Sequence, residues 1–175
     1  MANGNTIHIE QKEGVATEED KDKFRDTLKD ITDHIEKVRE IGCELADKLI
    51  DEGELELARK LLERVFCHDV SKFSSSFIKA MNSGDKEEKK LAIDWHRTSE
   101  RHHLSYFNGD TTEMSTVDLA EFSVDLISRA QEFCTDVRDY LKKFCLDRDI
   151  SANSYFCKTV NRFFNLVVDK PFKSI

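Results

Sequence analysis

Apolar residues recur at steps of three and four over most of the chain, a spacing that places side chains on one face of an α-helix. The first stripe begins after Thr17, which precedes three acids at 18–20 in the manner of a capped helix start. It runs up to Gly53 through Phe24, Leu28, Ile31, Ile35, Val38, Ile41, Leu45 and Leu49. This pattern predicts one long amphipathic helix.

Five further stripes follow the first along the chain. They predict helices over 54–68, 74–81, 86–103, 115–144 and 153–168. Residues 1–16 carry no such stripe and are predicted to form a flexible N-terminal tail. One proline and six glycines leave few points that break a helix. We therefore predict an all-α bundle of five to six helices, folded as a single domain over residues 17–175.

Composition and charge narrow the classes of function. Hydrophobic residues make up 39% of the 175 residues and charged residues 35%, as in a soluble globular protein. A net charge of −8 argues against general nucleic-acid binding, which needs a basic surface. No apolar run approaches the roughly 20 residues that span a bilayer, and the polar N-terminus lacks a signal-peptide core. We expect a cytoplasmic protein whose five cysteines, with no C-x-x-C motif, are buried free thiols.

Several histidines and acids fall beside the apolar stripes rather than in the loops. His34 borders the first stripe, with Asp30 one turn before it, and the pair His68–Asp69 closes the second helix. The later candidates are His96, His102, His103, Asp118, Glu121 and Asp125. Imidazole and carboxylate groups together suit zinc, iron or manganese, and a metal can join ligands from several helices.

Two other interpretations fit the same spacing. In the first, each histidine is an ordinary hydrogen-bonded residue at the edge of the core. In the second, His96, Glu100 and His103 form a small site within one helix. The second interpretation leaves His34 and the His68–Asp69 pair unexplained.

The ordered set of motifs resembles the HD superfamily of metal-dependent phosphohydrolases, which are helical proteins. The segments "TDHIEKV", "CHDVSKF" and "FSVDLIS" match its histidine, its adjacent His-Asp pair and its later aspartate. A narrower resemblance is to a group of small uncharacterised bacterial and phage domains, through "HDVSKF", "HRTSERHHLSYF" and "MSTVDLAEFSVD". The resemblance covers roughly residues 28–130 and implies an HD-domain-like bundle. The branch of the HD superfamily that acts on cyclic dinucleotides has glycine-tyrosine-proline segments, and this sequence lacks them. The resemblance therefore does not imply specificity for cyclic dinucleotides.

The resemblance implies a set of roles for individual residues. A first ion is expected on His34, His68, Asp69 and Asp125, and a second on His96, His102, His103 and Asp30. Asp118 matches the later aspartate of the family's motif as well as Asp125 does. Either of the two can therefore be the last ligand of the first ion. Lys72, in "HDVSK", is expected to bind phosphate, with Arg97 and Arg101 neutralising charge in the transition state. Glu121 is expected to orient a histidine ligand.

The implied reaction is hydrolysis of a phosphoester in a small nucleotide or cyclic nucleotide. One or two divalent ions (Mn, Fe, Co, Zn or Mg) lower the pKa of bound water and hold phosphate oxygens. Trp95 and Tyr106 are either core residues or a surface on which a base stacks. Two alternatives stay open: a non-catalytic interaction protein with a structural metal, and a di-iron oxygenase of HD-like fold. The oligomeric state is open between a monomer and a homodimer.

Overall fold

The computed structural model describes residues 16–168, which are all-helical and contain no strand. The predicted fold class is therefore confirmed. The described residues form seven α-helices and two short 3-10 helices: α1 (Glu18–Asp51), α2 (Leu55–Phe66), η1 (Val70–Phe73), α3 (Ser75–Asn82), α4 (Lys86–Ser99), η2 (Leu104–Phe107), α5 (Thr116–Glu132), α6 (Val137–Leu146) and α7 (Tyr155–Val167). The predicted tail over 1–16 and the end of the predicted domain, 169–175, lie outside the described residues, except for residue 16.

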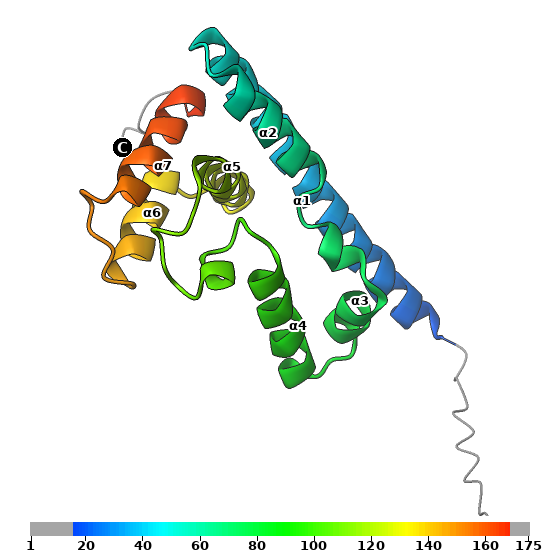
Figure 1. Cartoon of the computed structure of the whole chain (residues 1–175). Coiled ribbons are helices and arrows are strands. Elements are labelled where there is room, and N and C mark those ends of the chain that lie inside the picture. The colour runs from blue at the N-terminus through cyan, green and yellow to red at the C-terminus, as the bar shows by residue number, and fades with distance from the viewer. Residues whose placement is uncertain (1–15, 169–175) are drawn as a thin grey trace, which may run out of the picture.

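Helix α1 is the spine of the bundle, and α2 folds back along it (Figure 1). Helix α5 runs through the middle and contacts α1, α2, α6 and α7, so it is buried on nearly every side. The main core consists of aliphatic residues from α1, α2 and α5 packed on aromatic rings of α7, among them Val38, Leu45, Leu61, Leu119, Val124, Phe156, Phe163 and Phe164. Helices α3 and α4 form a separate corner beside the N-terminal half of α1.

The predicted helix over 115–144 is wrong, because the structure divides it into α5 and α6. Helix α5 ends at Glu132, and Cys134 then takes a left-handed conformation with φ of 50°. Asp136 begins α6 by accepting a hydrogen bond from the backbone N–H of Arg138 at 2.8 Å. The chain therefore has seven α-helices in its described part, rather than five to six. An aspartate N-cap without a preceding glycine or proline is a weak signal in sequence.

The predicted helix over 86–103 is too long. Helix α4 ends at Ser99, and Glu100 is extended, with φ −106° and ψ 125°. Arg101 then turns away to pair with Asp118, and His102 and His103 follow in the turn before η2. No glycine or proline marks this end of the helix, and the ion pair of Arg101 with Asp118 holds the chain in its new direction.

The cysteines follow the expectation in part. All five are free thiols, but only Cys145 and Cys157 are buried, while Cys43, Cys67 and Cys134 are exposed. The expectation of burial is therefore wrong for three of the five. Among the described residues, no helix has both the length and the hydropathy that a membrane span requires.

Helices α1 and α2 approach so closely that one position accepts only glycine. A Cβ atom added at Gly42 would lie 2.6 Å from Cγ1 and 2.9 Å from Cγ2 of Val65, which is fully buried. In an open helix Gly→Ala stabilises by up to about 1 kcal/mol, whereas overpacking a core costs about 1–3 kcal/mol.

We predict that Gly42→Ala lowers the free energy of unfolding, because the clash with Val65 outweighs the gain in helix propensity. The measurement is chemical denaturation followed by circular dichroism. In a Val65→Ala background the same Gly42→Ala change should be neutral or stabilising, since the clashing methyl groups are gone. A Gly42→Ala variant as stable as the parent would contradict the close contact.

Candidate metal centre

The site is built around the turn that follows α2. Helix α2 ends at Phe66, and Asp69 takes a left-handed conformation with φ of 58°. Adjacent side chains normally point in different directions, but this turn directs both His68 and Asp69 into the protein, where each is only 1% exposed. Aspartate is one of the few residues that adopt this conformation at modest cost.

A first group of possible ligands gathers around one oxygen of Asp69. His34 Nε2 lies 3.3 Å from Asp69 Oδ2 and 3.2 Å from Asp125 Oδ1. His68 Nε2 lies 3.5 Å and 3.8 Å from the same two oxygens. Ligands bound at about 2.1 Å to one ion stand roughly 3.0–3.5 Å apart. Three of these four distances lie in that range and the fourth is slightly longer, so the spacing is close to that of a metal site.

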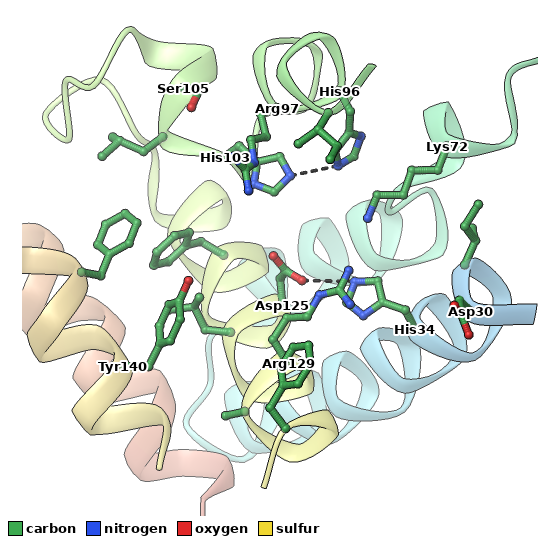
Figure 2. Close-up of a pocket in the computed structure, with 18 of the residues that line it drawn as sticks. Asp30, His34, Lys72, His96, Arg97, His103, Ser105, Asp125, Arg129 and Tyr140 are labelled. Carbon is green, nitrogen blue, oxygen red and sulfur yellow. Dashed lines mark hydrogen bonds and ion pairs between the residues drawn. The ribbon is translucent and has the colours of Figure 1, made fainter. Parts of the chain in front are cut away.

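A second group gathers around the other oxygen of Asp69. Oδ1 lies 3.1 Å from His96 Nε2 and 3.4 Å from His102 Nε2. The Nε2 atoms of His96 and His103 are 3.0 Å apart (Figure 2). Asp69 therefore presents one oxygen to each group, as a carboxylate bridging two ions does. The structure brings together His34, His68, Asp69, His96, His102, His103 and Asp125, from five parts of the chain.

The outer nitrogens of the histidines are held by polar partners. His34 Nδ1 is 2.7 Å from Glu132 Oε1, His68 Nδ1 is 3.1 Å from Glu121 Oε1, and His96 Nδ1 is 2.9 Å from Ser71 Oγ. With the proton on Nδ1, each ring turns the lone pair of Nε2 to the cluster, as a metal-binding histidine requires.

The inner atoms, by contrast, lack hydrogen-bond partners. Nε2 of His34, His68 and His102, together with Oδ1 of Asp69, is buried without one. Buried polar atoms are nearly always paired, so this set of unpaired atoms facing one another fits a divalent ion.

The charges of the cluster compensate one another. Burial disfavours protonation of His34, but the carboxylates of Asp125 and Asp69 outweigh it and raise its pKa to about 9. Burial acts the same way on His102, where Asp69 and Glu121 raise the pKa to about 10. Burial, with the charge of His102, lowers the pKa of His103 to about 2. In the metal-free protein near neutral pH, two imidazolium ions thus balance the buried carboxylates.

Asp118 has a different role from Asp125. Its Oδ1 accepts hydrogen bonds from Arg64 at 3.1 Å and Arg101 at 3.0 Å, and its Oδ2 accepts from Arg101 at 3.0 Å. Arg64 also donates to Glu121 Oε2 at 2.7 Å, which links this ion pair to the carboxylate behind His68 and His102. The choice between the two aspartates therefore falls on Asp125. Since Arg101 is held by Asp118, we no longer assign it to phosphate.

The cluster forms one wall of a cavity of about 1030 Å³. His34, His96, His103 and Asp125 line it, whereas His68, Asp69 and His102 lie behind them. Two predicted basic residues also line it, Lys72 and Arg97, and the Lys72 ammonium pairs with Asp69. Figure 2 shows both side chains beside the histidines.

Four residues considered in the sequence fall outside the two ligand groups. Asp30 lines the cavity but is exposed and belongs to none of the metal-like groups among the described residues. Glu100 is likewise in none of them, which argues against the site within a single helix. Trp95 and Tyr106 do not line the cavity, and both are exposed, so neither is a core residue nor a wall of this site.

Two partners of the histidines were missed in the sequence, Glu132 and Ser71. Both carried a signal. Glu121, Asp125, Ser128 and Glu132 follow one face of α5 at steps of four, three and four, which makes a polar stripe along this buried helix. Ser71 lies inside "HDVSKF" itself.

We predict that His68→Ala and Asp69→Ala abolish metal retention, and that Asp69→Ala loses both ions because it removes the oxygen shared by the two groups. The measurement is elemental analysis of the purified protein, with circular dichroism to confirm folding. Asp30→Asn is the matched control and should retain the metal. Unchanged metal content in Asp69→Ala would contradict the centre.

We also predict that metal binding releases protons. A histidine must be neutral to bind a metal, while His34 and His102 carry protons up to pH values of about 9 and about 10. Metal affinity should therefore rise with pH through this range. Titration calorimetry with Mn²⁺ at pH 7.5, in two buffers of different ionisation enthalpy, should give a release of about two protons per chain. A binding enthalpy independent of the buffer would contradict the charge state of the cluster.

Comparison with known proteins identifies a family but no activity. Neither the curated proteins nor the solved structures include a match to the chain. Residues 23–166, which include every residue of both ligand groups, match a family of unknown function, DUF5662. The chain therefore belongs to the family of unknown function DUF5662.

Proposed function

We propose that this protein is a metal-dependent phosphohydrolase of the HD type, which cleaves the phosphoester of a small nucleotide or cyclic nucleotide. The observation that carries the proposal is the shared carboxylate of Asp69, with one oxygen toward each histidine group at the wall of a large cavity. A divalent ion, when bound, acidifies a coordinated water and neutralises phosphate charge. Mn, Fe, Co, Zn and Mg are the candidate ions, one or two per chain.

The charge of the cavity supports an anionic substrate. Four lysine and arginine side chains line it, Lys72, Arg97, Arg129 and Arg148, against two aspartates, Asp30 and Asp125. Lys72 and Arg129 are paired with Asp69 and Glu132, yet the side chains that line the cavity are more cationic than the whole chain, whose net charge is −8. A basic cavity in an acidic protein attracts phosphate without attracting nucleic acid in general.

The chain's own residues divide the work of hydrolysis. Glu121, Glu132 and Ser71 fix the ring orientation of three histidines, so that their Nε2 atoms stay aimed at one point. Lys72, half-buried beside Asp69, supplies a cation to the phosphoryl oxygens as charge builds on them. In the reaction, a P–O bond forms with water and the P–O bond to the leaving group breaks, and the departing oxygen takes a proton.

The geometry favours a catalytic centre over a structural one. Structural sites are usually closed by protein ligands on all sides, whereas catalytic sites keep a position for water or substrate. Here four of the seven candidate ligands border the cavity. This supports hydrolysis over the alternative of an interaction protein with a structural metal.

A di-iron oxygenase is the second candidate, because a bridging carboxylate with histidines on both sides also suits a pair of irons. Its test is oxygen consumption by protein loaded anaerobically with Fe²⁺. The cytoplasmic location remains part of the proposal, and the free state of all five thiols is compatible with a reducing compartment.

We predict that protein loaded with Mn²⁺, Co²⁺ or Mg²⁺ releases phosphate from members of a nucleotide panel. Lys72→Ala should keep its metal and lose activity by on the order of a hundred-fold, since a cation next to the phosphoryl group is missing in the transition state. Phosphate release and metal content are measured on the same samples.

Lys79→Ala is the matched control, because Lys79 is exposed on α3 and does not line the cavity. It should hydrolyse at the parental rate. Parental activity in Lys72→Ala would remove its assigned role. Full metal retention without release of phosphate from any nucleotide would favour the structural-metal alternative.

A further inference from the structure

We propose that the cavity contains a second subsite, an aromatic arm formed by Phe122, Phe133, Tyr140 and Phe144, which binds the base of a nucleoside monophosphate whose phosphate lies at the metal groups. This inference rests on the proposed hydrolase function and names its substrate class. All four residues line the same cavity as His34 and Asp125. They lie on α5, on α6 and at the corner between these helices.

The aromatic arm has a rigid floor. Phe122 and Phe144 lie 5.4 Å apart between ring centroids, and both pack on the fully buried Phe156, at 5.3 Å and 6.1 Å. These rings are continuous with the main core, so the floor keeps its shape without a ligand.

The walls of the arm are aromatic side chains that the core does not cover. Phe133 is 70% exposed and Tyr140 is 50% exposed, although both line the cavity. Figure 2 shows the Tyr140 hydroxyl directed into the cavity, on the side of Asp125. Exposed aromatic rings that line a cavity offer apolar surface on which the flat ring of a base can stack.

The other residues of the arm offer recognition beyond stacking. The Arg148 guanidinium lines the cavity and lies over the Phe144 ring, 4.0 Å from its centroid, with Nη1 donating to the Phe144 carbonyl at 3.3 Å, so its other N–H groups are available at this side of the floor. A heteroaromatic base has ring nitrogens and carbonyl oxygens that accept such hydrogen bonds, which a purely hydrocarbon ring lacks.

Helix α5 sets the distance between the metal groups and Phe133, the outer end of the aromatic arm, whereas Phe122 in its floor lies three residues before Asp125. Asp125, Leu126, Arg129, Ala130 and Phe133 line the cavity in succession along one face. Eight residues from Asp125 to Phe133 correspond to about 12 Å along the helix. This spacing suits a phosphate, a sugar and a base in a row, and leaves an aryl phosphate, in which the ring is bonded directly to the phosphate group, too short to fill both ends. Arg129, at the middle of the face, stands where the sugar and the inner phosphate oxygens pass.

The test compares adenosine 5′-monophosphate with ribose 5-phosphate, which has the same phosphate and sugar but no base. With Mn²⁺-loaded protein, we expect kcat/KM to be at least about ten-fold higher for the nucleotide, the order of one stacked base. In Phe133→Ala and Tyr140→Ala, this ratio should fall toward one. Leu146→Ala is the matched control, because Leu146 is 71% exposed on the same helix as Tyr140 but does not line the cavity; its ratio should equal that of the parent.

A second measurement does not depend on catalysis. Titration calorimetry of metal-free protein with the same two compounds should show tighter binding of the nucleotide, weakened about ten-fold in Tyr140→Ala and unchanged in Leu146→Ala. This binding measurement distinguishes the failure of the aromatic arm from the failure of the hydrolase proposal. Binding that depends on Tyr140, without release of phosphate from either compound, would sustain the aromatic arm and reject the hydrolase.

Three results would overturn the aromatic arm while leaving hydrolysis in place. The first is equal hydrolysis of the two compounds by the parent protein. The second is a selectivity ratio that Phe133→Ala and Tyr140→Ala leave at the parental value. The third is calorimetric binding of the nucleotide no tighter than that of ribose 5-phosphate.

Discussion

The arrangement of the site depends on the turn that buries Asp69. Its left-handed backbone brings two consecutive polar side chains to the same side of the chain, directly after a helix whose other inward residues are apolar. A buried carboxylate is costly unless it is compensated, and here five cationic or potentially cationic groups surround it: Lys72, His34, His68, His96 and His102. Their attraction holds the pKa of Asp69 well below its usual range, even though burial acts to raise it.

This compensation extends outward in two directions. Behind the histidines, Glu121 contacts His68 and His102 and is tied by Arg64 to Asp118. On the other side, Glu132 holds His34 and is paired in turn with Arg129. His34, His68 and His102 are therefore oriented by carboxylates that have ion pairs of their own, an arrangement that keeps histidines in place around a site.

The sequence predicted the fold class and most helices because their apolar stripes are long and regular. It predicted the members of the cluster through the order of motifs rather than through spacing alone, since no local pattern relates His34 to Asp125.

Two helix ends could not be predicted from the sequence. The ion pair between Arg101 and Asp118 ends the fourth helix, and the left-handed Cys134 divides the fifth. Both depend on contacts or conformations that leave little trace in local composition. The cavity could not be predicted from the sequence either. Its aromatic wall forms only because the predicted helix over 115–144 is divided into α5 and α6.

The ligands also come from positions spread over 92 residues, from His34 on α1 to Asp125 on α5. Nothing in a chain that ends before α5 can supply the last of them. The full set of candidate ligands therefore comes together only after α5 has been synthesised. If the proposed metal binds there, its acquisition would follow the assembly of α1, α2, α4 and α5 around the site.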